Sequence, residues 1–150
     1  MKILTFTLDE PRYALYLSIV ERVIHAVEIT PLPKAPEIVP GIINVHGEIL
    51  PVIDIRKRFN LPFRERMIED VFIIAGTDKR KVVLVADAVS SITEVDEEDI
   101  RTAQTNISFA ENIKGVVKLE KGLFLICDMD MFLSLDEESR LSSALSGKTK

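Results

Sequence analysis

The sequence is poor in the residues that build disulfide, metal and nucleotide sites. It has one cysteine, Cys127, so no internal disulfide can form, and its apolar surroundings at residues 123–127 predict a small buried side chain. The two histidines, His25 and His46, belong to no metal-binding motif, so we expect no metal and no cofactor. The six glycines form neither a dinucleotide-binding fingerprint nor a phosphate-binding loop.

Long apolar runs and an excess of positive charge are also missing. No run approaches the roughly 20 apolar residues that a membrane-spanning helix needs. The N-terminus lacks the apolar stretch and small-residue cleavage site of a signal peptide. We therefore expect a soluble, cytoplasmic protein that does not insert into a membrane. The formal net charge of −5 argues against long-range attraction to nucleic acid or anionic lipid.

Signals for β-strands dominate what is present. Apolar and polar residues alternate in two N-terminal runs, and later runs are continuously apolar, as in strands buried on both faces. These runs lie at residues 4–8, 13–17, 71–75, 82–86 and 123–127. Three hairpin turns are predicted, at residues 47–48, 76–79 and 121–122. The pattern predicts an all-β fold.

Helices are expected to be few and short. Asp54, and either Asp128 or Asp130, precede short segments whose first backbone N–H groups a carboxylate can cap. Asp136 is the predicted cap of a final helix with acidic residues in its first turn. Beyond Ser146 the tail is small and polar, and we expect it to be disordered.

An internal repeat is the most informative feature. Residues 41–55 align without gaps with residues 115–129, and residues 14–23 align with residues 83–92 in a second register. The matched positions include an initial glycine and a later aspartate, namely Gly41 with Gly115 and Asp54 with Asp128. The spacing, about 70 residues, is that of a domain rather than a solenoid. Two similar hairpins in an ordinary β protein are the alternative, which the repeated aspartate disfavours.

The repeat predicts two similar β-subdomains within a single domain, residues 1–150. The first covers about residues 1–65 and the second about residues 68–135, with a C-terminal tail at residues 136–150. Units of that size are marginally stable alone, so we expect a shared apolar interface, with the chain free to cross between them. Gly41 should need a positive φ or a close backbone approach. Structural roles are predicted for Gly41, Pro51, Asp54, Gly115 and Asp128.

Two other functions have some support. The basic cluster at residues 56–66, with Phe59 and Phe63 interleaved, is typical of single-stranded nucleic-acid binding by a small β-barrel. Nearby acidic residues dilute the cluster, and the phenylalanines fall where the first subdomain should pack, so nucleic acid is an alternative rather than the expected partner. A carboxylate pair at Glu48 and Asp54 has no catalytic motif around it. Solvation of Glu48 and capping by Asp54 are favoured over catalysis.

Several segments together resemble the CheW-like domain family. The most specific block runs from Gly41 to Arg56, and the resemblance extends from about Ile3 to Leu135. The matching segments are residues 20–23, 29–33, 40–47, 51–56, 82–89, 99–101 and 113–119.

The resemblance implies a fold of two interlocked, five-stranded SH3-like barrels with a third apolar core between them. It also implies a free-standing, non-enzymatic adaptor that couples chemoreceptors to the chemotaxis histidine kinase in two-component signalling. Such an adaptor binds the cytoplasmic tip of the chemoreceptor in a groove between subdomains. It binds the regulatory domain of the kinase through pseudo-symmetric barrel contacts, and so joins membrane receptor arrays through its partners.

Partner-binding residues follow from the same resemblance. They are expected at Val20, Arg22, Val23, Asn44, His46, Gly47 and Glu48, with Val20 and Val23 as apolar anchors for a helix tip. The family commonly has arginine where this chain has His46, and glutamate where this chain has Arg22. If relatives form an acid–base pair there, two like-charged groups face each other in this chain unless Glu21 or Glu48 supplies negative charge. We hypothesise that this chain serves a divergent class of receptor.

Overall fold

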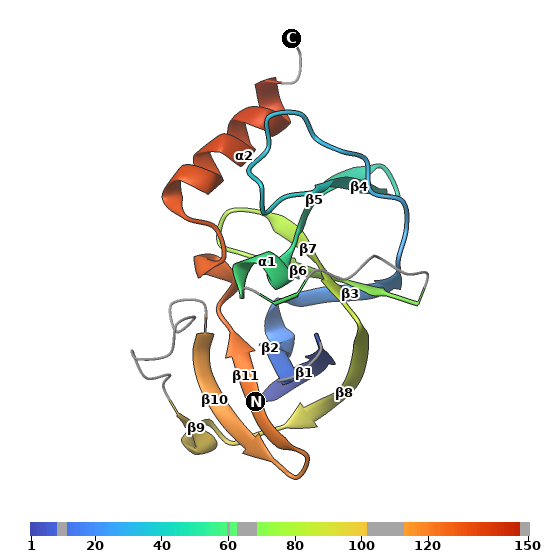
Figure 1. Cartoon of the computed structure of the whole chain (residues 1–150). Helices are drawn as coiled ribbons and strands as arrows, with labels where there is room; N and C mark the ends of the chain where they lie inside the picture. The colour runs from blue at the N-terminus through green and yellow to red at the C-terminus, as the bar shows by residue number, and fades with distance from the viewer. Residues whose placement is uncertain (9–11, 60, 63–68, 102–112, 148–150) are drawn as a thin grey trace.

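The computed structural model describes residues 1–8, 12–59, 61–62, 69–101 and 113–147, and it is mostly β (Figure 1). One sheet, called the first sheet here, has six strands in the order β8-β1-β2-β11-β10-β9. The second sheet has five, in the order β3-β6-β7-β5-β4. The strands of the first sheet are β1 (Lys2–Thr7), β2 (Arg12–Tyr16), β8 (Ala88–Glu94), β9 (Ile100–Arg101), β10 (Ile113–Leu119) and β11 (Gly122–Cys127). Those of the second are β3 (Val20–His25), β4 (Gly41–Val45), β5 (Glu48–Ile53), β6 (Val71–Gly76) and β7 (Lys81–Ala86).

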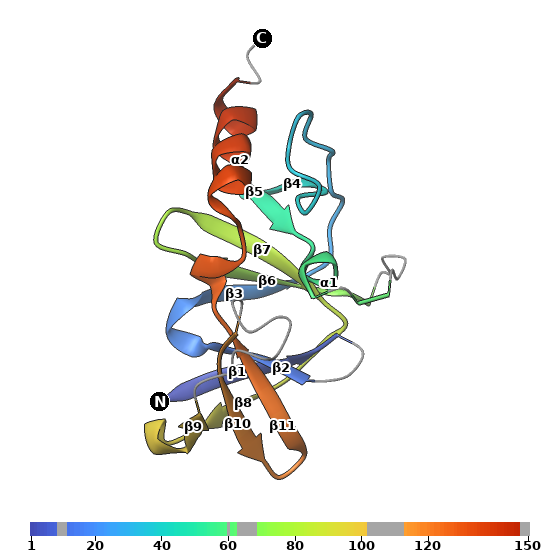
Figure 2. The ribbon, with the colours of Figure 1, turned by 60° about the vertical axis from the view of Figure 1, so that its left-hand side comes forward.

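The chain crosses between the sheets twice. After the pair β1 and β2, a short 3₁₀ turn, η1 (Leu17–Ile19), leads β3 into the second sheet. After the pair β6 and β7, strand β8 returns to the first sheet. The expected division at about residues 65–68 therefore does not separate the sheets, because each of them takes strands from both halves of the chain. Figures 1 and 2 show the two sheets as adjacent layers, with the β4–β5 and β10–β11 hairpins at opposite ends.

The internal repeat holds at the level of single residue pairs. Within the hairpins, Gly41 pairs with Val52 in the second sheet as Gly115 pairs with Ile126 in the first. Both hairpins then pair in parallel with an inner strand, β5 with β7 and β11 with β2. The expected five strands become six in the first sheet because β9 pairs with β10. The equivalent partner of β4 is a single bridge residue, Thr30, which is too short to form a strand.

The two matched glycines lie where backbones cross closely. A Cβ atom on Gly41 would lie 2.2 Å from the Thr30 carbonyl oxygen, and one on Gly115 would lie 2.8 Å from the Arg101 carbonyl oxygen. Of the two expected reasons for a glycine, close approach is the one that applies, since neither residue has a positive φ. The Thr30 bridge also explains Pro51. Both backbone groups of its partner Ile42 bond to Thr30, so β4 requires no N–H from Pro51.

Three apolar cores follow from this arrangement. The largest lies between the sheets and contains Tyr13, Phe59 and Phe132, whose rings stack or meet edge to face. Smaller cores fill the concave sides of the first and second sheets, around Phe124 and Phe72 respectively. The core between the sheets, which the family resemblance implies, is thus present. It includes Cys127, whose burial raises the pKa of the thiol.

Equivalent aspartates cap the turns that follow the two hairpins. The Asp54 carboxylate accepts hydrogen bonds from the backbone N–H groups of Arg56 and Lys57, at the start of α1 (Ile55–Arg58). Asp128 accepts one from Asp130 at the start of the 3₁₀ turn η4 (Met129–Met131). A further 3₁₀ turn, η2 (Glu97–Asp99), precedes β9.

The predicted C-terminal helix is present, but its cap differs from the prediction. Helix α2 (Leu135–Gly147) buries Leu141 and Ala144. Its cap is Ser134 rather than Asp136: the Glu137 N–H donates to the Ser134 hydroxyl, while the Ser134 N–H donates to the Glu137 carboxylate. The predicted disorder beyond Ser146 falls mostly outside the described residues. No helix of the described part of the chain is long and apolar enough to span a membrane.

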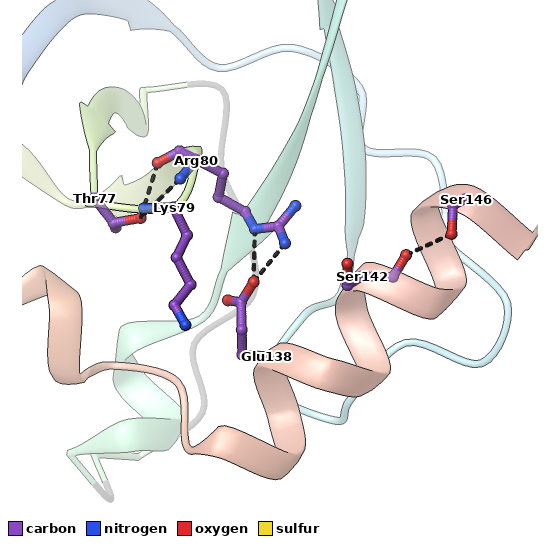
Figure 3. Close-up of polar contacts among 6 residues, drawn as sticks. All are labelled: Thr77, Lys79, Arg80, Glu138, Ser142 and Ser146. Atoms are coloured by element: carbon purple, nitrogen blue, oxygen red, sulfur yellow. Dashed lines mark hydrogen bonds and ion pairs between the residues drawn. The ribbon is translucent and has the colours of Figure 1, made fainter.

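Two ion pairs fasten α2 to the rest of the molecule. Arg80, in the β6–β7 loop, binds the Glu138 carboxylate through its guanidinium (Figure 3). Thr77 shapes that loop by accepting hydrogen bonds from the N–H groups of Lys79 and Arg80. The second ion pair comes from α1, where an Arg58 guanidinium nitrogen lies 2.5 Å from a Glu137 carboxylate oxygen. Because all four charged side chains are largely buried, these pairs join α1 and the β6–β7 loop to α2 more firmly than exposed pairs would.

The close approach at Gly41 predicts a large cost for any side chain there. Gly41→Ala should lower the free energy of unfolding by about 2–3 kcal/mol, because the added methyl group meets a backbone carbonyl that a bonded bridge holds in place. Gly76→Ala is the control, since a Cβ there has nothing within 4 Å. The measurement is urea unfolding followed by circular dichroism. Equal stability of the two variants would contradict the proposed crowding.

The ion pair of Glu137 predicts a dependence of stability on pH. Burial alone raises the pKa of Glu137, but hydrogen bonds from Arg58 and Ser134 outweigh it and hold the pKa below the ordinary value. A lowered folded-state pKa stabilises the fold above the unfolded value, about pH 4.3, and this contribution disappears as the pH falls further. Glu137→Gln should therefore cost about 1 kcal/mol at pH 7 and much less near pH 3. An identical loss at both pH values would rule out this linkage.

Candidate partner-binding surface

The tip of the β4–β5 hairpin is a two-residue turn made by His46 and Gly47. Both have positive φ, 52° and 89°, which defines the type I′ turn that suits the twist of a hairpin. The turn was predicted at residues 47–48, one residue beyond its observed position, since Glu48 already pairs with Val45 in the strands. The Asn44 side chain accepts a hydrogen bond from the Gly47 N–H at 2.8 Å and so fixes the turn. The tip is exposed from Asn44 to Ile49, apart from half-buried Val45.

Strand β3 carries the other predicted anchors. Its register against β6 shifts between Val20 and Arg22, so Glu21 is the extra residue of a bulge. The shift places Val20 and Val23 on one face, opposite Ala75 and Ile73, and turns Arg22 to the other. Val20 packs against the core between the sheets, whereas Val23 is exposed.

A lysine that the sequence analysis did not single out joins β3 to this hairpin. The Lys81 ammonium group, on β7, lies 3.0 Å from a Glu21 carboxylate oxygen and 3.1 Å from one of Glu48. Hydrogen bonds to Glu21 and then Glu48 raise the pKa of Lys81, so it stays charged at neutral pH. One ammonium group thus faces two carboxylates, so Glu21, Glu48 and Lys81 together keep an excess of negative charge. Within the described part of the chain, no hydrogen bond or ion pair joins the exposed Arg22 and His46 to each other.

The repeat places a matching surface on the first sheet. Under the alignment of the two halves, Val23 on β3 corresponds to Ile92 on β8, and Ile49 on β5 corresponds to Leu123 on β11. All four are exposed apolar side chains, at 41% for Val23, 58% for Ile92, 48% for Ile49 and 58% for Leu123. A hollow of about 260 Å³ lies between β8 and the β10–β11 hairpin, and Ser91, Thr93, Leu119 and Phe124 are among the residues that line it.

The predicted basic cluster is already paired with acidic side chains. Arg56 binds both carboxylate oxygens of Asp87 at 2.9 Å, and Arg58 binds Glu137. Lys57 lies 3.8 Å from a Glu37 oxygen. Phe59, interleaved among them, is buried in the core between the sheets. The remaining members of the cluster, Phe63, Arg64 and Arg66, lie outside the described residues. The described part of the cluster therefore offers few free charges for phosphate groups.

Comparison with known proteins decides the family. A family model described as the CheW-like domain matches residues 2–137. The chain belongs to this family.

CheW-like relatives agree in length as well as in sequence. Chemotaxis protein CheW of Thermotoga maritima is 30% identical over 132 residues, which cover 88% of this chain and 87% of the relative. Chemotaxis protein CheW of Bacillus subtilis is 30% identical over 144 residues, covering 95% and 91%. The crystal structure of the scaffolding protein TtCheW from Thermoanaerobacter tengcongensis matches with a TM-score of 0.82 and 30% identity, over 91% of this chain and 89% of that chain.

The hairpin turn of this CheW-like chain predicts opposite effects for substitutions at its two positions. Gly47→Ala forces a methyl group onto a residue with φ of 89° and should cost about 1 kcal/mol. His46→Gly relieves the φ of 52° and should be neutral or slightly stabilising. Thermal unfolding tests this, with a fall of about 3 °C expected for Gly47→Ala only. A fall of the same size for both variants would show that side-chain contacts, not backbone strain, govern the turn.

Proposed function

We propose that this chain is a chemotaxis adaptor, which couples chemoreceptors to the chemotaxis histidine kinase and catalyses no reaction itself. Its family and the scaffolding relatives support the class of function. The observation that carries the proposal is the repeated pair of exposed apolar side chains, one pair on each sheet. An adaptor needs two separate surfaces for two partners, and the matched exposed side chains support one candidate surface on each sheet.

The chemistry of the two surfaces fits protein partners. Single exposed apolar residues are ordinary on any protein, so exposure alone would carry no argument. Here the exposed residues recur at equivalent positions and stand beside charged groups: Glu48 precedes Ile49, and the exposed Lys118 is paired with Leu123 across β10 and β11. Apolar anchors surrounded by polar groups are typical of the centre of a protein interface.

We assign the surface on the second sheet to the chemoreceptor. It comprises Val20, Val23 and the hairpin tip from Asn44 to Ile49. Since Val20 also contacts the core between the sheets, this surface continues toward the junction of the two sheets, where we expect the helix tip of the receptor to pack. The equivalent surface on the first sheet, with Ile92 and Leu123, would then bind the regulatory domain of the kinase. The adaptor would act in the cytoplasm and reach membrane arrays through these partners.

Nucleic-acid binding is the weaker alternative. Of the arginines that suggested it, Arg56 and Arg58 are held by Asp87 and Glu137, and the aromatic residue Phe59 is buried. Signalling by an adaptor needs no catalytic geometry. It needs both partners to be bound at once, so that a change in the receptor alters the state of the kinase through a shared free energy.

Substitution of one anchor on each surface tests the proposal. Val23→Asp should weaken binding of a receptor-tip fragment at least tenfold, because the new charge replaces an apolar anchor, and should leave kinase binding unchanged. Ile92→Asp should do the reverse. Isothermal titration of each variant into both partners measures this.

The control is Leu135→Asp, a change of the same kind at an exposed position of α2 outside both surfaces. It should bind both partners normally. If the unmodified protein binds neither the kinase regulatory domain nor the receptor fragment from its own genome, the adaptor function is wrong.

A further inference from the structure

Two basic residues occupy equivalent positions in the two halves of the molecule. Lys81 is the first residue of β7 and Arg12 is the first of β2, and the alignment of the halves matches them. Strands β7 and β2 are the inner strands, each of which pairs in parallel with the second strand of a hairpin. Each basic residue therefore lies near the tip of the hairpin with which its strand pairs: Lys81 near the β4–β5 tip and Arg12 near the β10–β11 tip.

Lys81 reaches the tip of the β4–β5 hairpin through ion pairs. It binds Glu48, which precedes the exposed Ile49, and Glu21, the bulge residue two positions before the exposed Val23. Strands β3 and β5 are not neighbours in the sheet, since β6 and β7 lie between them. This one ammonium group thus links the two strands that carry the apolar anchors.

Arg12 reaches the tip of the β10–β11 hairpin by other chemistry. Its Nη1 donates a hydrogen bond to the backbone carbonyl of Lys121, in the turn, and its guanidinium lies 5.9 Å from the centre of the Phe124 ring. Gly122, equivalent to Glu48, has a positive φ of 133°, and a Cβ there would be in ordinary contact with the same nitrogen, at 3.6 Å. The exposed Leu123 follows directly.

We infer that Lys81 and Arg12 are positioning residues, one for each partner surface, and that each sets affinity for one partner only. The inference rests on the adaptor function proposed above. Each cation holds a hairpin tip, and with it an exposed anchor, in the arrangement that the partner meets. A hairpin tip that is already ordered loses less entropy on binding. Removal of the basic side chain should therefore weaken affinity although no contact with the partner is lost.

The two tethers should differ in their response to salt. Lys81 and its glutamates are all two-fifths or more exposed, so added salt screens their attraction. Arg12 binds a neutral carbonyl group and an aromatic ring, which depend less on ionic strength. Salt should therefore loosen the receptor-facing tip and leave the kinase-facing tip nearly unchanged.

The experiment compares Lys81→Gln, Lys81→Arg and Arg12→Gln with the unmodified protein. Titrations into the receptor-tip fragment and the kinase regulatory domain are made at 50 mM and 500 mM NaCl. At low salt Lys81→Gln should weaken receptor binding about fivefold and flatten its salt dependence, with kinase binding intact, and Lys81→Arg should restore both. Arg12→Gln should weaken kinase binding about fivefold at both salt concentrations.

Amide hydrogen exchange in the free protein provides a readout that needs no partner. Lys81→Gln should speed exchange at residues 44–49 only, and Arg12→Gln at residues 119–123 only. Unchanged exchange in both variants, or equal weakening of both partners by either variant, would overturn the inference while leaving the adaptor function standing. Failure of the unmodified protein to bind either partner would instead overturn the adaptor function, and selective exchange at the two tips would still show the tethers.

Discussion

The close crossing of two backbones at each matched glycine is the constraint on which the architecture depends. At Gly41 and Gly115 there is no room for a Cβ atom, and the neighbouring carbonyl of Thr30 or Arg101 belongs to a segment that pairs with the same strand. This contact fixes the first strand of each hairpin against its outer neighbour. The second strand then meets an inner strand in parallel, and the aspartate after it caps a turn that packs into the core between the sheets.

Much of this fold could be predicted from the sequence, because the two halves of the internal repeat form equivalent strands and turns. The matched glycines, the matched aspartates and the spacing of apolar runs predicted two equivalent β units around a shared core, and the structure contains them. The boundary between the units was not accessible. Periodicity reports which residues form strands but not which strands pair, and the exchange of β3 and β8 between sheets depends on contacts between distant residues. The cap of α2 was predicted wrongly at Asp136, because the sequence analysis did not consider the reciprocal hydrogen bonds that Ser134 and Glu137 form.

The surface was less predictable than the fold. The family resemblance indicated the hairpin tip and β3, whose roles remain predictions, but it did not indicate Lys81, whose importance comes from bringing Glu21 and Glu48 together. The repeat alone pointed to Lys81, because the alignment that matches Val23 to Ile92 also matches Lys81 to Arg12. The pairing of Arg56 and Arg58 in the basic cluster could not be predicted either. Their acidic partners Asp87 and Glu137 lie far away in sequence, so the charges seemed free.

The exchange of strands between sheets has a consequence for how the molecule assembles. A hydrogen bond between Thr5 and Ser91 spans 86 residues, and one between Arg12 and Lys121 spans 109. Strands β1 and β2 must therefore wait, during synthesis, until nearly the whole chain has emerged before their sheet can form. Contacts this distant in sequence slow folding, and they make it cooperative across both sheets. Neither half of the chain contains all the strands of either sheet, so we expect neither half to fold when it is expressed alone.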